Sequence, residues 1–174
     1  QSPLHYLSPD QVVVIDGVSK SHCMTGWRIG WAMGPASVIA AMTKVQSHQT
    51  SNPTAVSQHA AVAALNDGDA HVATLVASLE GRRDVFVERL ERISGLGVLR
   101  PQGAFYVLVD VQRFLLDGED DVAFCGALLD DQAVAAVPGS AFGAPGWLRM
   151  SIAVAATDLA LAADRLETFV NGRR

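Results

Sequence analysis

An apolar run near the start of the chain, Val12-Val13-Val14-Ile15, places the strongest constraint on the fold. Four consecutive β-branched residues between polar neighbours favour a strand that is buried on both faces, as in a parallel sheet. A loop follows at Asp16, and this loop carries Lys20. Open α/β sheets bind ligands beyond the carboxyl ends of their parallel strands. The sequence therefore predicts that Lys20 lies at a ligand-binding edge.

Arg28 follows Lys20 on the same stretch, among glycine and tryptophan residues. An amine that forms an imine must be partly neutral, and burial near another cation lowers an ammonium pKa. Arginine stays charged and can grip a phosphate through two parallel hydrogen bonds. An aldehyde cofactor that carries a phosphate needs both groups. A solvated Lys20 and an Arg28 that extends to water explain the same residues, so their types alone leave both interpretations open.

Several motifs of this chain occur in the same order as in a known protein family. Ser19-Lys20, followed by Met24-Thr25-Gly26-Trp27-Arg28-Ile29-Gly30-Trp31, resembles the pyridoxal-phosphate lysine segment of class I/II aminotransferases, the aspartate aminotransferase-like group of fold type I. Further matches follow in family order: Thr50-Ser51-Asn52-Pro53-Thr54, Pro101-Gln102-Gly103-Ala104-Phe105-Tyr106, Pro138-Gly139-Ser140-Ala141-Phe142-Gly143 and Leu148-Arg149-Met150-Ser151. The ordered series spans almost the whole chain.

The resemblance implies an α/β fold that corresponds to the carboxyl-terminal half of a fold type I pyridoxal-phosphate transferase. Residues 1–74 would form the carboxyl-terminal part of the large cofactor-binding domain, and residues 75–174 the small α/β domain, joined through a long helix. Family groups that contact the cofactor ring lie upstream of such a half. We therefore expect the chain by itself to be weakly active or inactive.

Local patterns predict the individual elements. Strands are expected over residues 12–16, 27–33, 98–99, 104–109, 134–137 and 147–152, and helices over 36–47, 55–65, 72–93, 121–130 and 158–170. The first helix has an apolar stripe at helical spacing, which predicts a buried face. Thr157 is the expected cap of the last helix.

Arg149 lies between the apolar residues Leu148 and Met150 of a predicted strand, where an unpaired charge would be costly. From these residues alone, an ion pair with a local carboxylate explains the position as well as a ligand does. The resemblance assigns Arg149 to the substrate α-carboxylate and places Phe142 in the same pocket. Tyr106 is predicted to belong to the core.

The remaining site residues follow from the resemblance. Lys20 would hold pyridoxal phosphate covalently and would also move the proton of the substrate Cα. Arg28 would anchor the cofactor phosphate, and Ser19 is a second candidate for a phosphate contact. The implied reaction transfers an amino group from an L-amino acid to a 2-oxo acid, of the aspartate or aromatic aminotransferase type.

Donor identity and two rival functions stay open. Enteric-type aspartate aminotransferases have an arginine near the position of Ser47, so aspartate specificity does not follow. The chain could also belong to a transcriptional regulator that senses pyridoxal phosphate, which an upstream DNA-binding module would indicate. A fold type I lyase would release pyruvate and ammonia without a 2-oxo acid acceptor.

The amino-acid composition bears on which kinds of partner the chain can bind. The chain is 49% hydrophobic and 18% charged, with a formal net charge of −5, and it has no basic stripe of the kind that binds nucleic acid. Cys23 and Cys125 form neither a disulfide framework nor a zinc pattern, no metal motif is present, and no apolar stretch approaches the ~20 residues of a membrane span. We expect a cytoplasmic protein that binds neither nucleic acid nor membrane, and the resemblance implies a homodimer for the full-length protein.

Overall fold

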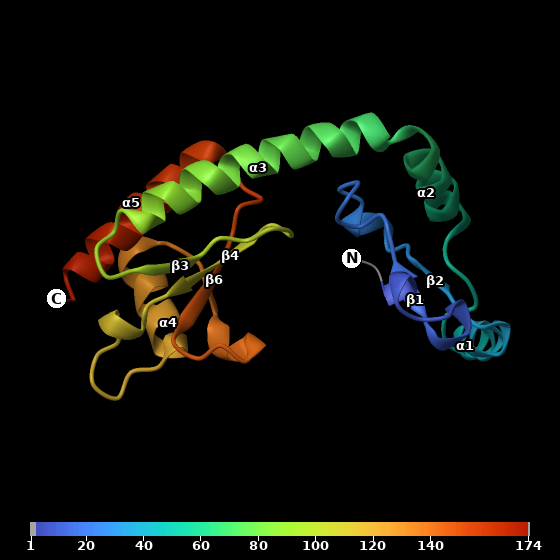
Figure 1. Ribbon diagram of the computed structural model, residues 1–174, viewed down its shortest axis with the longest axis horizontal. Helices are drawn as coiled ribbons and strands as arrows, with labels where there is room; N and C mark the ends of the chain where they lie inside the picture. The colour runs from blue at the N-terminus through green and yellow to red at the C-terminus, as the bar shows by residue number, and fades with distance from the viewer. Residues whose placement is uncertain (1–2, 174) are drawn as a thin grey trace. The chain divides into compact units, whose positions relative to one another are not determined.

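The structure, a computed structural model, describes residues 3–173; residues 1, 2 and 174, at the ends of the two predicted domains, lie outside it. The chain divides into two compact units, Gln1–Leu75 and Val76–Arg174 (Figure 1). The long helix α3, Asp69–Glu91, contributes residues to both. Each unit is described by itself.

The first unit contains a small antiparallel sheet and two helices. Strand β1 (Val14–Asp16) pairs with β2 (Trp31–Met33), with Asp16 opposite Trp31. Helices α1 (Ala36–Gln49) and α2 (Ala55–Asp67) follow, as the sequence predicts. Short 3-10 helices cover Pro3–His5, Pro9–Gln11 and Thr25–Trp27.

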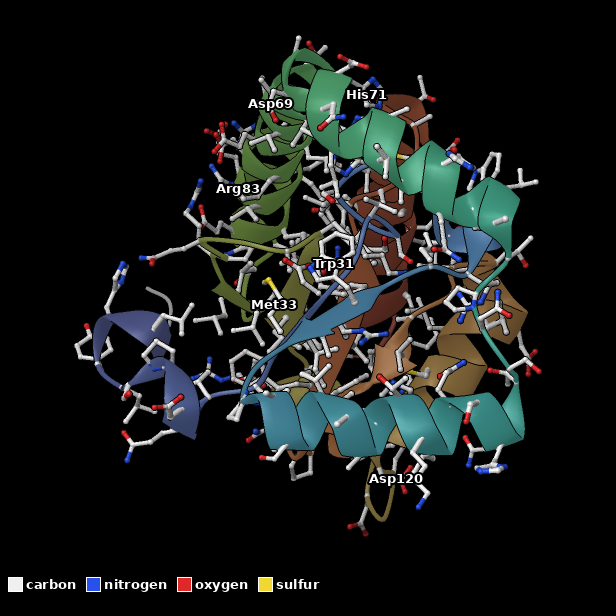
Figure 2. All side chains as sticks on the ribbon, turned by 90° about the vertical axis from the view of Figure 1, so that its right-hand side faces the viewer. Trp31, Met33, Asp69, His71, Arg83 and Asp120 are labelled. Carbon is white, nitrogen blue, oxygen red and sulfur yellow. The ribbon has the colours of Figure 1, made fainter. Side chains whose placement is uncertain are left out.

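The prediction of a buried parallel strand over residues 12–16 is wrong. Strand β1 is antiparallel to β2, and Ile15 is 76% exposed. Within the described part of this unit, β2 is the sole strand beside β1, and of the two apolar residues of β1 only Val14 is half-buried. On β2, Trp31 and Met33 point away from helix α1 (Figure 2).

Helix α1 has the predicted length but not the predicted buried face, since it contains no buried residue. Val38, Met42 and Val45 are all exposed. Among the described residues of the first unit, burial is confined to Val12, Val18, Ser57 and Ala61. Ile39, another member of the stripe, is half-buried, so the apolar stripe of α1 is only partly covered within this unit.

The second unit is built on a four-stranded antiparallel sheet in the order β3-β4-β6-β5. Its strands are β3 (Gly97–Leu99), β4 (Tyr106–Asp110), β5 (Val137–Pro138) and β6 (Trp147–Ser151). Its later helices are α4 (Asp121–Gln132) and α5 (Ala156–Asn171), and 3-10 helices cover Gln112–Phe114 and Gly139–Phe142.

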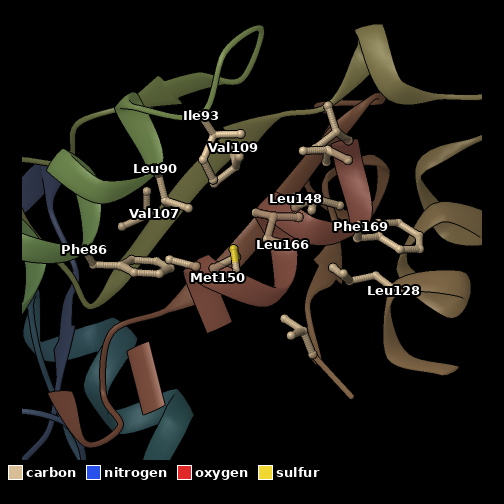
Figure 3. Close-up of a cluster of buried hydrophobic side chains, with 14 of the residues drawn as sticks. Phe86, Leu90, Ile93, Val107, Val109, Leu128, Leu148, Met150, Leu166 and Phe169 are labelled. Carbon is tan, nitrogen blue, oxygen red and sulfur yellow. The ribbon is translucent and has the colours of Figure 1, made fainter. Parts of the chain in front are cut away.

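One hydrophobic core holds the second unit together. Side chains alternate along a strand, so Val107 and Val109 of β4 face the same side as Leu148 and Met150 of β6, and all four are buried. They join one cluster with residues of α3, α4 and α5 (Figure 3), including Phe86, Leu90, Phe124, Leu128, Leu166 and Phe169. The helices therefore cover one face of the sheet, and the opposite face carries Tyr106 and Arg149.

The helix starts follow from their capping residues. The Asp120 carboxylate accepts a hydrogen bond from the Ala123 backbone N–H at 2.8 Å and caps α4. Helix α5 begins at Ala156, so the predicted cap at Thr157 is wrong. Ala155, with φ −61° and ψ 148°, is the last extended residue, and this places Thr157 inside the first helical turn.

Candidate functional site

Ser19, Lys20 and Arg28 lie on one connection, residues 17–30, between β1 and β2. Asp16 and Trp31 are paired partners at its two ends, so the connection leaves the sheet and returns to the same point. Lys20 is exposed and Ser19 is half-buried. Lys20 directly follows β1 as predicted, although that strand pairs in the antiparallel sense.

Two glycines let the ends of this connection approach each other. A Cβ added at Gly30 would lie 3.0 Å from the Asp16 carbonyl oxygen, and one at Gly17 would lie 3.1 Å from the Ile29 carbonyl oxygen. Real Cβ atoms scarcely tolerate such contacts with backbone. Glycine at both positions therefore keeps the base of the lysine loop closed.

Arg28 has a left-handed backbone with φ 51°, which interrupts the strand predicted over residues 27–33 and delays β2 to Trp31. Its guanidinium donates one hydrogen bond, from Nη1 to the Thr25 carbonyl oxygen at 3.1 Å. Within residues 3–173 no carboxylate forms an ion pair with it. An exposed guanidinium with donors to spare suits a phosphate ligand.

Arg149 occupies the centre of β6, opposite Leu108 of β4. Its guanidinium carbon lies 4.1 Å from the ring centroid of Tyr106 and 4.1 Å from that of Phe142. A cation over an aromatic face at this range is attracted by the ring quadrupole. The guanidinium therefore has a cation–π contact with each of the two rings.

Among the residues that the structure describes, none forms an acidic partner for the Arg149 side chain. Its Nε is buried without a hydrogen-bond acceptor, and none of the ion pairs of the described residues includes it. The alternative interpretation, an ion pair with a local carboxylate, is therefore wrong for residues 3–173. Arg149 is half-buried, and a buried N–H donor that lacks an acceptor is costly unless a ligand supplies one. The arrangement suits a carboxylate ligand.

Tyr106 was predicted to be a core residue, and that prediction is wrong. The residue is half-exposed on the face of the sheet opposite the core, stacked on Arg149. The signal lay in the strand period, because Tyr106 lies two positions from Leu108, the residue opposite Arg149. Alternation along β4 and β6 places both side chains on one face.

Phe142 reaches Arg149 from the end of the 3-10 turn Gly139–Phe142. A Cβ on Gly139 would collide with the Ala144 carbonyl oxygen and with Trp147, so the turn packs closely against the chain that follows it. The Asp121 carboxylate accepts a 2.7 Å hydrogen bond from the Ser140 backbone N–H. The turn is thus held both by the packing of Gly139 and by the hydrogen bond from Ser140 to Asp121.

Asp121 is a buried carboxylate that stays ionised. Burial by itself would raise its pKa, but hydrogen bonds from the Ser140 backbone and side chain, from its own backbone and from Gly146 lower the pKa below its usual value. Cys125 lies one turn further along α4, and its pKa shifts in the opposite direction. Burial and the nearby Asp121 charge raise the pKa of the Cys125 thiol to about 11.

A metal site and a membrane span are both absent from the described residues. In the part of the chain that the structure describes, no group of histidine, cysteine and acidic residues could hold a metal ion. No helix formed by residues 3–173 has both the length and the apolar character of a membrane span.

Comparison with known proteins shows the family. The family model for class I and II aminotransferases matches residues 4–166. The chain is 45% identical over 164 residues to an aspartate aminotransferase of Bacillus sp. (strain YM-2), covering 92% of this chain and 41% of that protein. It is 40% identical over 169 residues to an aspartate/prephenate aminotransferase of Nitrosomonas europaea, covering 92% and 43%. The chain thus spans about two-fifths of the length of these relatives.

Comparison with solved structures points to the same family. The crystal structure of the aspartate aminotransferase of Thermotoga maritima matches with a TM-score of 0.85 and 42% identity, over 93% of this chain and 40% of that one. The aromatic aminotransferase of Pyrococcus horikoshii matches with a TM-score of 0.87 and 33% identity, over 94% and 44%. The fold is that of fold type I aminotransferases, and the chain belongs to the class I and II aminotransferase family.

Proposed function

We propose that this chain is part of a pyridoxal-phosphate-dependent enzyme that transfers an amino group from an L-amino acid to a 2-oxo acid. The observation that carries the proposal is Arg149, whose guanidinium contacts two aromatic rings and whose buried Nε has no acceptor among the described residues. Family membership supplies the reaction class. The domain assignment is part of the proposal: residues 1–74 would belong to a larger cofactor domain and residues 75–174 would form the small domain.

The residues of the lysine loop fit the cofactor. Lys20 offers an exposed amine for covalent attachment, and Arg28 offers a guanidinium without a carboxylate partner in residues 3–173 for the phosphate. Ser19 adds a hydroxyl on the same loop. When bound, the cofactor supplies an aldehyde and an electron-withdrawing ring. Lys20 would take the proton from the substrate Cα and return one during the exchange, acting as general base and acid.

Arg149 would bind the substrate α-carboxylate. Its planar fork can form two parallel hydrogen bonds with a carboxylate, which fixes the orientation of the amino acid. The Tyr106 and Phe142 rings limit the movement of the guanidinium and keep water from its faces. Lysine at this position would lose both the fork and the stacking.

Relatives guide the choice of substrate. Those compared above are named aspartate, aspartate/prephenate and aromatic aminotransferases. Aspartate is therefore the first donor to test, with aromatic amino acids second. A regulator or a lyase is not favoured, since these names describe neither. A homodimer and a cytoplasmic location are further parts of this proposal.

The lysine content of the chain permits a sharp test of the cofactor site. Lys20 and Lys44 are its two lysines, and both are exposed. The chain would be mixed with pyridoxal phosphate and reduced with borohydride, and the labelled peptide would be located by mass spectrometry. We expect the label on Lys20 in preference to Lys44, and less label in Arg28→Ala because the phosphate anchor is lost.

Matched variants control this experiment. Lys44→Arg should leave the labelling of Lys20 unchanged, and Arg113→Ala, which removes an exposed arginine of the second unit, should behave like the original chain. Equal labelling of both lysines, insensitive to Arg28→Ala, would contradict a cofactor site on this loop.

A further inference from the structure

Asp121 joins three separate segments of the second unit. It stands at the first position of α4, and it is 2% exposed. Its carboxylate accepts the Ser140 backbone N–H at 2.7 Å, and it also interacts with the Ser140 hydroxyl and with the Gly146 backbone. Ser140 belongs to the turn that ends at Phe142, and Gly146 directly precedes β6.

This carboxylate has no cationic partner among the described residues. A buried anion without hydrogen bonds would be expensive, and here backbone N–H and hydroxyl donors replace water. Charge-assisted hydrogen bonds of this kind are stronger than neutral ones. The Ser140 hydrogen bond therefore ties the turn to the start of α4, and the close packing of Gly139 on Trp147 places the turn against the start of β6.

Both attached segments lead to the carboxylate-binding group. The turn ends at Phe142, whose ring lies 4.1 Å from the Arg149 guanidinium carbon, and β6 carries Arg149 itself. Movement of the turn relative to β6 would separate the ring from the guanidinium. Phe142 is 51% exposed, so the position of its ring over Arg149 depends on the position of the turn that carries it.

We propose that Asp121 is a positioning residue for the substrate carboxylate site: its carboxylate holds the 139–142 turn against the start of β6, and so keeps Phe142 stacked on Arg149. Asp121 touches no substrate in this role, and it acts through Phe142. The assignment rests on the proposed function, in which Arg149 binds the α-carboxylate.

Two measurements on the 174-residue chain test the proposal. The first is the Nε–H resonance of Arg149 in a ¹⁵N–¹H spectrum, identified by its loss in Arg149→Lys; stacked rings displace this resonance from the position of a free arginine. The second is the Kd for 2-oxoglutarate, measured by titration in the same spectra. In Asp121→Ala we expect the resonance to move toward the free position and the Kd to rise about tenfold, because one cation–π contact and the orientation of the guanidinium are lost.

Cys125→Ala provides the matched structural control. Cys125 is buried one turn along α4 from Asp121, and its removal should lower stability without touching the turn. We expect the resonance and the Kd to stay at their original values in Cys125→Ala. Asp121→Asn, which retains an oxygen acceptor and the side-chain size, should shift both readouts in the same direction by a smaller amount. It decides the question if Asp121→Ala does not fold.

The outcomes separate the two proposals. If a folded Asp121 variant loses stability while the resonance and the Kd stay unchanged, Asp121 is structural and the inference is overturned. If the original chain does not bind 2-oxoglutarate, the carboxylate-site proposal fails in this chain. The resonance of Arg149 in the Asp121 variants then still shows whether Asp121 positions the stacked pair.

Discussion

At the scale of single residues, the surroundings of Arg149 are those expected of a guanidinium that binds an anionic ligand. It combines a buried Nε that lacks an acceptor with two aromatic rings at 4.1 Å. Structural arginines of this chain look different: Arg173 pairs with Glu119 at 2.5 Å and also stacks on Phe124 and Phe169. Aromatic contact occurs in both cases, so the lack of a carboxylate partner among the described residues distinguishes Arg149 from Arg173.

A substitution series at Tyr106 tests whether its ring face supports Arg149. The Tyr106 hydroxyl forms no hydrogen bond within the described structure, whereas its ring contacts the guanidinium. Tyr106→Phe should therefore leave the Kd for 2-oxoglutarate within about twofold, and Tyr106→Leu should raise it roughly fivefold, the equivalent of about 1 kcal/mol of cation–π attraction. Titration of the purified variants measures both. Equal weakening by Phe and Leu would instead assign the contribution to the hydroxyl.

At the scale of elements, helix α5 shows how the burial of a side chain determines its contribution to the free energy of unfolding. Leu166 is 0% exposed within the core cluster, and Leu161, on the same helix, is 47% exposed. Both residues are leucines within one helix, so helix propensity contributes equally to their replacement by alanine. Any difference between the two substitutions therefore reports packing.

Leu166→Ala should lower the free energy of unfolding of the second unit by about 2–5 kcal/mol, because it removes buried methyl groups and leaves a cavity. Leu161→Ala should change it by less than about 0.5 kcal/mol. Urea denaturation followed by circular dichroism measures both variants. A similar loss in the two would indicate that the exposed face of α5 is packed in solution.

At the scale of the whole molecule, the two units differ in how much they bury. The second unit has one continuous core that includes residues of three helices and two central strands. The described part of the first unit buries Val12, Val18, Ser57 and Ala61, while large apolar side chains such as Ile15 and Met33 stay exposed. Exposed apolar surface of this kind is typical of an interface. The first unit thus leaves apolar side chains on its surface that another surface could cover.

Hydrogen exchange on the isolated chain should reveal this difference. Amides of α1 and α2 should exchange much faster than those of β4, β6 and α5, because local opening costs little where few side chains are buried. Peptide-level exchange with mass spectrometry resolves these segments. Comparable protection of α1 and β6 would show that the first unit is stabilised by contacts that its own residues do not provide, for example in an oligomer.

Local patterns in the sequence were sufficient to predict the helices, two of the strands and the family of this protein. Helical spacing predicted α1, α2, α3, α4 and α5 to within a few residues, and strand alternation predicted β4 and β6. The ordered motifs identified the family, because each motif is contiguous in sequence. Lys20, Arg28 and Arg149 could be singled out for the same reason, since their chemistry can be recognised from adjacent residues.

Tertiary structure alone decided the rest. The pairing direction of β1, the exposure of the α1 stripe and the left-handed Arg28 depend on which surfaces meet, which no local pattern encodes. The ring contacts of Arg149 likewise join β6 to β4 and to the turn that ends at Phe142, and the Asp121 bond to Ser140 joins helix α4 to the same turn. Periodicity shows which face of an element is apolar, but long-range packing selects the residue that lies opposite it.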